Sequence, residues 1–391
     1  PIVLLLVLCS ISFVSTKGYR ILATLFAVEL GAGPLQTGML FAMWGLFPFV
    51  LSIYAGRLAD RFDNRVLMYC GLAGFTVSLL LPFVFPGLTA LYLSAALGGC
   101  TTMLFVVATQ NLVGVLSSAE SRTRNFSYYS LAESSAAIVG PVLVGLCIDA
   151  FRHPFTFAVL AAINSACLML LFARRNRIPN TIRNVDRKVN RSAKDLLALS
   201  DLRNALLANG TVMAGLDLFN LYMPVYTHSL GFSATSIGLI MGVFGIAAFV
   251  TRLAIPPFTS RWGEHAMMAG ALVVSALAFI AVPFAKQPLV LGFASFVLGL
   301  GLGCGQPLSM ILAFNAAPRD RSAEAIAMRL AVSYGAHVVI PPVFGAVGAA
   351  LGLAPIFWTC AILLGGGSAL TRPKKKSINA KDAKEKSKVA D

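Results

Sequence analysis

The sequence has little charge for its length. Only 12% of its 391 residues are Asp, Glu, Lys or Arg, whereas 57% are hydrophobic, and the mean hydropathy is +0.79. A soluble chain of this composition would expose large apolar patches to water. The composition therefore predicts a chain that lies in a lipid bilayer.

Residues that bind metals or form disulfides are also scarce. The seven cysteines are odd in number and scattered, and the four histidines have no clustered partners. Neither set has the spacing of a zinc site or of a disulfide framework. We therefore predict no metal and no cofactor. A membrane enzyme would need an acid, a base or a metal set gathered near one membrane interface, and the lack of that pattern predicts a protein that is not an enzyme.

Twelve apolar runs follow one another along the chain. A helix needs about 20 apolar residues to cross the hydrocarbon core of a bilayer, and each run is long enough to form one. The runs begin near Ile2, Leu35, Val66, Leu88, Asn125, Phe155, Ala205, Ser233, Ala266, Leu289, Ser322 and Ala354. We predict one transmembrane helix for each run.

The two halves of the chain match each other at an offset of 200 residues. In that alignment Gly38 meets Gly238 and Pro141 meets Pro341. Two repeats of six helices, related by an axis along the membrane normal, build a large class of secondary transporters. The repeat therefore predicts an all-α membrane protein with two pseudo-symmetric six-helix bundles.

The net charge of +15 could suggest a nucleic-acid partner, but the basic residues are placed asymmetrically. Most of the 31 Lys and Arg fall in loops on one side of the predicted spans, and only Arg152 and Lys286 fall in loops on the other. Basic loops stay in the cytoplasm. We therefore predict a multi-pass protein of the bacterial inner membrane, with both termini cytoplasmic and no nucleic-acid partner. The expected divisions are a first bundle at 1–174, a linker at 175–203, a second bundle at 204–372 and a basic tail at 373–391.

The loop between the second and third runs carries a motif. It reads GRLADRFDNR over 56–65 and resembles the signature loop of the major facilitator superfamily, which Gly56, Asp60, Arg61 and Arg65 match. The family's turn glycine is replaced here by Asp63. Because Asp and Asn tolerate the positive φ of a tight turn best after glycine, we expect the turn to be kept.

A second resemblance lies in the fifth run. Gly140, Pro141 and Gly145 are similar to the Gly-Pro motif of the family's proton-driven exporters, although the upstream glycine spacing is missing. Where the family has a fourth-span arginine associated with proton transfer, this chain has Ser94 and Ala95. The resemblance to the small bacterial members implies twelve helices and transport of a small molecule by alternating access, and it hints at proton-coupled export. We also expect a monomer.

Charged and polar residues stand inside several runs, where a charge is costly. Lys17 and Arg20 share one face of the first helix, and Asp217 and Asn220 occupy the equivalent positions of the seventh. In the family these helices face each other across a central cavity, so the resemblance places the four residues, with Gln306, around the substrate. Their excess positive charge favours a carboxylate or phosphate. The alternative is an ion pair between Lys17 and Asp217 that only joins the halves.

Glu133 lies near the middle of the fifth run, away from any loop. A carboxyl group at this depth is cheaper in its neutral form than in its ionised form. We therefore predict that Glu133 carries a coupled proton. The alternative is a permanent ion pair with Arg252 of the eighth helix, which the family's architecture would place opposite it.

The resemblance also implies gating residues, which we predict to be Gly56, Asp60, Arg61, Arg65, Arg252 and Arg329. Asp60 is expected at the start of the eleventh helix, where the helix dipole stabilises a carboxylate. Arg329 should lie within its reach, forming a cytoplasmic latch. His337, two turns further along, is expected to be a hydrogen-bonded packing residue rather than a proton relay.

Three classes of function fit a chain of this kind: a secondary transporter, a membrane enzyme, and a lipid flippase or sensor on the same scaffold. The repeat and the intramembrane charges favour the transporter. Within that class, export of an anionic or amphipathic small molecule leads over uptake of a nutrient or siderophore.

Overall fold

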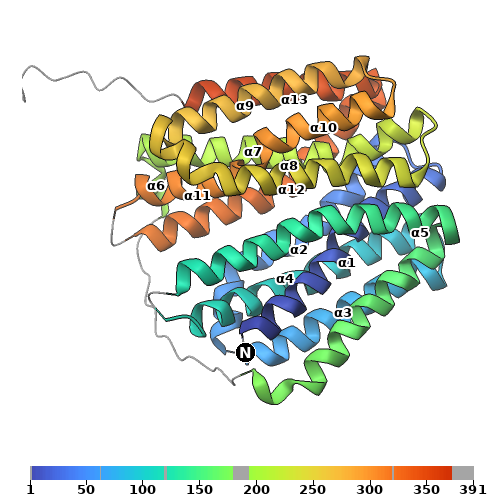
Figure 1. The fold of residues 1–391 in the computed structure, drawn as a ribbon, viewed down its shortest axis with the longest axis horizontal. Coiled ribbons are helices and arrows are strands. Elements are labelled where there is room, and N and C mark those ends of the chain that lie inside the picture. The colour runs from blue at the N-terminus through green and yellow to red at the C-terminus, as the bar shows by residue number, and fades with distance from the viewer. Residues whose placement is uncertain (1, 62, 119–120, 179–192, 319–320, 372–391) are drawn as a thin grey trace, which may run out of the picture.

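The computed structural model describes residues 2–61, 63–118, 121–178, 193–318 and 321–371, and this part of the chain forms long helices without strands (Figure 1). The long helices are α1 Ile2–Glu29, α2 Pro34–Arg61, α3 Asn64–Val84, α4 Leu88–Val115, α5 Arg122–Ala173, α7 Ser200–Ser229, α8 Ala234–Trp262, α9 Glu264–Ala281, α10 Pro288–Gly303, α11 Gly305–Ala316, α12 Ser322–Leu351 and α13 Leu353–Thr371. Three short elements lie between them: η1 Arg175–Arg177, α6 Ala193–Leu197 and η2 Val282–Phe284.

These helices are consistent with the twelve predicted spans. In the described residues, nine helices are long and apolar enough to cross a membrane, and Pro34–Val50 is a shorter apolar helix. One of the nine, within α5, breaks at Arg152, where φ is 63°, and so supplies two spans. Helices α10 and α11 meet at Cys304 and together form one. Helix α7 completes the set, although its polar residues lower its hydropathy.

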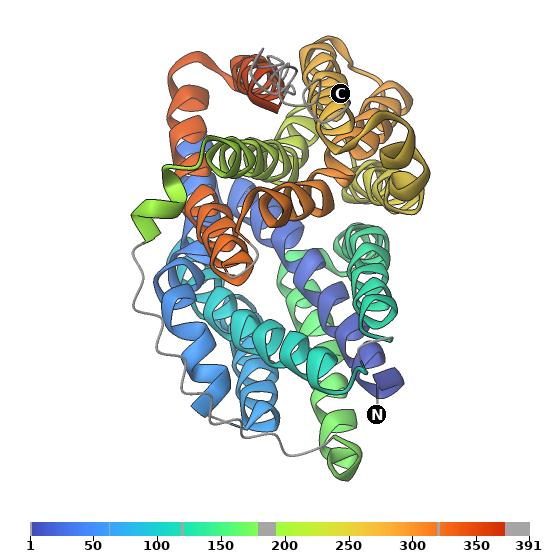
Figure 2. The same cartoon turned by 90° about the vertical axis from the view of Figure 1, so that its left-hand side faces the viewer.

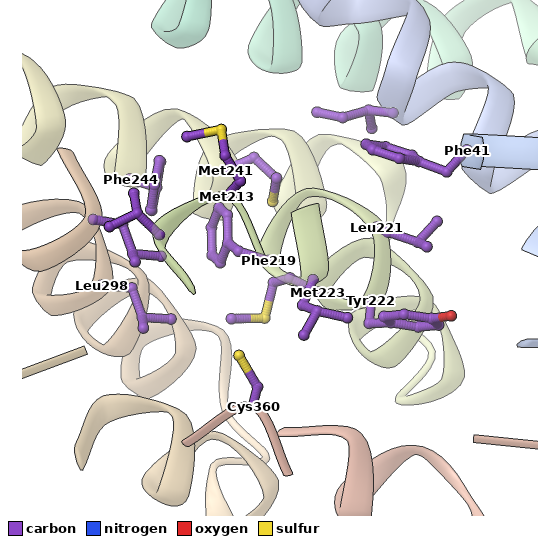
Figure 3. Packing of buried hydrophobic residues seen from close by; sticks show 14 of the residues in the cluster. Phe41, Met213, Phe219, Leu221, Tyr222, Met223, Met241, Phe244, Leu298 and Cys360 are labelled. Atoms are coloured by element: carbon purple, nitrogen blue, oxygen red, sulfur yellow. The ribbon is translucent and has the colours of Figure 1, made fainter. Parts of the chain in front are cut away.

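The helices gather into two bundles. Figure 1 shows α1 to α5 on one side and α7 to α13 on the other, and the turned view in Figure 2 shows the same division. The bundles meet where α2 packs on α12 and α5 packs on α8, with α1 also touching α7. A cluster of buried apolar side chains runs through this junction, and Figure 3 shows α7 residues Met213, Phe219 and Tyr222 within it.

Matching turns end the first helix of each bundle. Gly31 has φ of 82° and Gly231 has φ of 81°, a left-handed conformation that glycine adopts without steric cost. The backbone amide of Gly31 donates to the carbonyl of Val28 and that of Gly231 donates to the carbonyl of His228, both at 2.9 Å. The 200-residue repeat is thus a repeat of local structure, which places α2 and α8 equivalently in the two bundles.

Two glycine contacts join the bundles. A Cβ on Gly38 of α2 would collide with the carbonyl oxygen of Pro341 of α12, and one on Gly238 of α8 would collide with that of Pro141 of α5. Only glycine allows the backbones to approach this closely. The positions that align at the 200-residue offset are therefore partners in two equivalent interfaces, which we call the α2/α12 seam and the α5/α8 seam.

Polar contacts close the same end of both seams, the end at which α2 and α8 begin, which we call the distal end. At the α5/α8 seam, the Asp149 carboxylate accepts from the backbone amides of Ala234 at 3.2 Å and Thr235 at 2.8 Å. At the α2/α12 seam, the Tyr222 hydroxyl of α7 donates across the bundles to the carbonyl of Pro34 of α2 at 3.3 Å, and it also lies 2.9 Å from the carbonyl oxygen of Pro341. These contacts tie the two bundles together at the distal end.

Candidate functional site

A cavity of about 270 Å³ lies between the two bundles. Its wall includes all five residues that the sequence suggested as substrate ligands: Lys17, Arg20, Asp217, Asn220 and Gln306. Glu133 and Arg252 also line it, together with Tyr334 and His337 of α12. The geometry thus brings the predicted residues together at one place, and their role in binding stays a prediction.

Lys17 of α1 forms an ion pair with Glu133 of α5, with 3.0 Å between Nζ and Oε1. Gly140 makes this approach possible, because a Cβ there would stand only 3.1 Å from the Cβ of Lys17. Two turns separate Gly140 from Glu133, so both face α1. The structure therefore pairs Lys17 within its own bundle, and the alternative of a Lys17 to Asp217 ion pair across the halves is not what it shows.

Asp217 of α7 instead contacts His337 of α12. The Nδ1 atom of His337 lies 2.8 and 2.6 Å from the two carboxylate oxygens, and Asp217 is only 1% exposed. Because a carboxylate accepts hydrogen bonds, Nδ1 is the donor. His337 is hydrogen-bonded as expected, but its place in the cavity wall beside a buried acid is a feature that the sequence reading missed. The 120 residues between the partners left no local signal for it.

Arg20 is held by aromatic rings. Its guanidinium carbon lies 5.2 Å from the centre of the Phe41 ring and 5.7 Å from that of Trp44. Trp44 stacks on Tyr19 at 4.9 Å, and the Tyr19 hydroxyl is hydrogen-bonded to Ser94 at 3.0 Å. Ser94, which stands near the place of the family's arginine, therefore helps to fix the wall behind Arg20.

Arg252 of α8 crosses the α5/α8 seam. Its Nη1 donates to the hydroxyls of Ser134 at 2.5 Å and Ser130 at 3.3 Å. Glu133 lies between these two serines in the sequence, yet it forms its ion pair with Lys17. The expected alternative, a Glu133 to Arg252 ion pair, is thus replaced by hydrogen bonds from Arg252 to neighbouring hydroxyls.

Two amides complete the polar part of the wall. Asn220 Nδ2 donates to the carbonyl of Leu216 at 2.7 Å, and Gln306 Nε2 lies 3.7 Å from the sulfur of Met213. The rest of this side is apolar and is formed by Met241, Phe244 and Leu302 among others. The second bundle therefore offers the cavity an apolar and amide-lined surface beside its charged residues Asp217 and Arg252.

Arg329 lies outside the cavity wall, in a polar cluster of the second bundle. Its Nη1 donates to Asn209 Oδ1 at 3.2 Å and to Ser309 Oγ at 3.4 Å. Asn209 in turn donates to the Arg329 carbonyl at 3.2 Å and to Ser333 Oγ at 3.0 Å. The side chains of Gly56, Asp60 and Arg61 lie outside the described residues. A latch between Asp60 and Arg329 therefore stays a prediction.

The motif loop turns without a left-handed residue at Asp63. Asp63 has φ of −58°, and its carboxylate accepts from the Arg65 amide at 3.1 Å, which caps the start of α3. The expectation that Asp63 would replace glycine in a positive-φ turn is wrong, because helix capping supplies the turn instead. The guanidinium of Arg65 donates to the carbonyl of Ile178, so this predicted gating residue binds its own bundle next to the linker.

The chain belongs to the Major Facilitator Superfamily, whose model matches residues 5–208 and 205–390. The protein is therefore a multi-pass membrane transporter, with a small-molecule substrate and a lipid bilayer as its surroundings. No group of three or more His, Cys, Asp or Glu in the described residues could hold a metal ion.

The relatives of this chain include two bacterial resistance proteins. Multidrug resistance protein 1 of Bacillus subtilis (strain 168) is 25% identical over 253 residues, which are 63% of this chain and 64% of that protein. Quinolone resistance protein NorA of Staphylococcus aureus (strain COL) is 23% identical over 287 residues, 71% and 72% of the two chains. The match to the first thus spans less than two thirds of its length.

Solved structures share the fold. The nucleoside transporter NupG has a TM-score of 0.80 with 15% identity, covering 95% of this chain and all (100%) of its own. A bacterial homologue of the human lysosomal transporter Spinster, in an inward-facing and unoccupied conformation, has a TM-score of 0.77 with 11% identity over 95% of each chain. At this identity the likeness shows the fold alone.

Proposed function

We propose that this protein exports a small anionic or amphipathic organic molecule across the bacterial inner membrane, in exchange for protons, by alternating access. The observation that carries the proposal is a cavity between the two bundles whose wall holds three cations, Lys17, Arg20 and Arg252, and two acids, Glu133 and Asp217. The three cations outnumber the two acids by one positive charge. A positive cavity raises the local concentration of anions.

Export rather than uptake is supported by the names of the relatives, which are described as multidrug and quinolone resistance proteins. Gly140 supports it in a second way, because this residue of the exporter-like motif permits the contact between Lys17 and Glu133. Uptake of a nutrient or siderophore and lipid flipping are the alternatives, and the transport experiment below separates them.

A coupled proton can act on the structure through the ion pair between Lys17 and Glu133. A proton bound to Glu133 cancels the carboxylate charge and breaks its ion pair with Lys17, which links the proton to a contact between α1 and α5. Loss of the proton restores the ion pair. Exchange follows if the bundles rock when either the proton or the substrate is bound, but not both, so that the two cross the membrane in opposite directions.

Gating follows from the two ends of the molecule. The glycine contacts, the Asp149 hydrogen bonds and the hydrogen bond from Tyr222 to Pro34 hold the distal end closed. In alternating access these contacts part as the opposite end closes, where we place the latch of Gly56, Asp60, Arg61, Arg65 and Arg329. Arg252, bound to Ser134 across the α5/α8 seam, would have to release as the bundles rock. With both termini cytoplasmic, the distal end faces outward, and a monomer contains the whole site.

The proposal is tested with purified protein in liposomes. The probe is naphthalene-2-sulfonate, a permanent anion that does not cross lipid as a neutral acid, and the liposome interior is made acidic. We expect accumulation that collapses with the proton gradient and is absent from protein-free liposomes. Accumulation only with an alkaline interior would favour uptake, and movement of a labelled phospholipid instead would favour a flippase. The proposal would be contradicted if the proton gradient changed the accumulation of neither this probe nor its neutral amide and cationic amidinium analogues.

A further inference from the structure

The cations of the cavity differ in how they are satisfied. Lys17 is bound to Glu133 at 3.0 Å, and Arg252 is bound to the hydroxyl of Ser134 at 2.5 Å. Arg20 is different, because its Nε is buried and has no hydrogen-bond acceptor anywhere in the described residues. A buried donor without an acceptor costs free energy, and the cost is larger for a charged group. An anion bound to the part of Arg20 that lines the cavity would offset this cost by compensating the charge.

The surroundings of Arg20 also fix where a ligand would stand. The rings of Phe41 and Trp44 hold the guanidinium at 5.2 and 5.7 Å, and both rings are buried. Gly99 permits α4 to pack against the backbone of Trp44, where a Cβ would collide with its carbonyl oxygen. The cation is therefore presented on a rigid aromatic support, which lowers the entropy lost when it binds an anion.

The remainder of the cavity suits a compact apolar body. Met213, Met241, Phe244 and Leu302 form the wall contributed by the second bundle. Phe244 stacks on Phe219 at 4.1 Å, so this wall is also packed from behind. The volume of about 270 Å³ lies below the range of roughly 300–1,000 Å³ that is usual for drug-sized ligands. The space favours a ligand of about two fused rings or smaller.

We propose that the transported molecule is a small organic monoanion, with a carboxylate bound to Arg20 and a ring-sized apolar body against the methionine and phenylalanine wall. The inference rests on the proposed function, since it names the substrate class of that site. Arg20 is the one cavity cation, among the described residues, with a buried side-chain nitrogen that has no hydrogen-bond partner. A second negative charge on the ligand would therefore meet the acids Glu133 and Asp217 rather than another available cation.

The test compares four probes with the same two rings. These are naphthalene-2-carboxylate, its neutral amide, its amidinium cation and naphthalene-2,6-dicarboxylate, with binding measured by calorimetry on the purified full chain in detergent. We expect the carboxylate to bind about tenfold or more tightly than the amide, as one charge-assisted hydrogen-bonded pair implies. The amidinium and the dicarboxylate should be weaker than the monocarboxylate. Tighter binding of the amide or the amidinium would overturn the inference.

Variants then locate the charge. Arg20→Gln should remove the preference for carboxylate over amide, and Arg20→Lys should retain part of it. Arg174→Gln removes an exposed arginine outside the cavity and is the matched charge control, with the preference unchanged. A preference that survives in a folded Arg20→Gln would refute the assignment. If that variant does not fold, the four probes measured on the unmodified protein and on Arg20→Lys still test whether Arg20 sets the preference for the carboxylate.

Binding in detergent needs neither a proton gradient nor turnover. Different results would therefore contradict the transport proposal and the proposal of the ligand class. Carboxylate binding at Arg20 in a protein that moves no probe across liposomes would overturn the transport proposal and leave the ligand class standing. Proton-driven transport of the amidinium, with no preference for carboxylate, would do the reverse.

Discussion

His337 of α12 lies 2.6 Å from a carboxylate oxygen of Asp217 of α7, and the two side chains form a buried pair in the cavity wall. The backbone of His337 also fits against Gly45 of α2, where a Cβ would stand 2.7 Å from the histidine Cβ. The pair thus lies next to the contact between α2 and α12. This position links the interior of the second bundle to the surface on which the bundles meet.

Removal of His337 should destabilise the protein. In His337→Leu the Asp217 carboxylate, which is 1% exposed, would lose its donor, and breaking such a buried pair costs about 3 kcal/mol or more. We expect a clearly lower Tm in detergent. His337→Gln keeps a side-chain donor and is the control, with a smaller loss. Equal Tm values for His337→Leu and the unmodified protein would show that the pair contributes nothing to stability.

Neutralising Glu133 should separate coupling from transport. Glu133→Gln keeps the shape of the side chain but cannot gain or lose the proton, and it breaks the charge pairing with Lys17. We expect proton-driven transport of the sulfonate probe to be abolished, while exchange of probe for probe continues. The measurement is transport against pH in liposomes. An unchanged pH dependence would leave the Lys17 to Glu133 pair as a structural ion pair only.

The proposed latch predicts a defect without unfolding in Asp60→Asn. A carboxylate at a helix N-terminus is stabilised by roughly half a kcal/mol or more, and the amide loses most of this. We expect slower transport with an unchanged Tm. The comparison is with Asp201→Asn, an exposed acid in the first turn of α7 that lies outside the motif. Full turnover by Asp60→Asn would argue against the latch.

A single methyl group should disturb the α2/α12 seam. In Gly38→Ala the new Cβ would collide with the Pro341 carbonyl, so the distal end could close only after the helices move apart. We expect a shift toward the state open at this end, seen as faster thiol labelling of a cysteine placed at the distal end of the cavity. Gly270→Ala is the matched control, because nothing lies within 4 Å of the Cβ it would gain. Identical labelling of both variants would count against a closed distal end.

The sequence predicted the framework better than the pairings. Predicted starts near Leu88 and Ser322 are the starts of α4 and α12, because proline, glycine and polar residues interrupt the apolar runs there. The alignment at 200 residues correctly indicated two equivalent bundles. It could not show helix rotation about the long axis, which decides which buried side chain meets which partner.

Lys17 illustrates this limit. The sequence suggested Asp217 as the ion-pair partner of Lys17, whereas the observed pair with Glu133 depends on how closely Gly140 lets α5 approach α1. That distance comes from packing in three dimensions. The prediction of a left-handed turn at Asp63 was wrong for a more local reason. Asp is suited both to a left-handed turn and to capping a helix, and the residue type alone does not distinguish the two.

The glycine seams make each bundle complementary to a second copy of itself. Each bundle carries one helix with a buried seam glycine, Gly38 or Gly238, and one helix whose proline carbonyl, at Pro141 or Pro341, receives the glycine of the other bundle. This is the arrangement of an isologous dimer, in which every contact occurs twice.

In a dimer of identical bundles, however, the same side chain would face itself across the cavity, so that Lys17 would oppose a second lysine. Joining two diverged bundles in one chain removes that constraint. Lys17 and Arg20 can stand on one wall while Asp217 and Asn220 stand on the other, so that the equivalent positions of the two walls carry different side chains, which a symmetric assembly could not have.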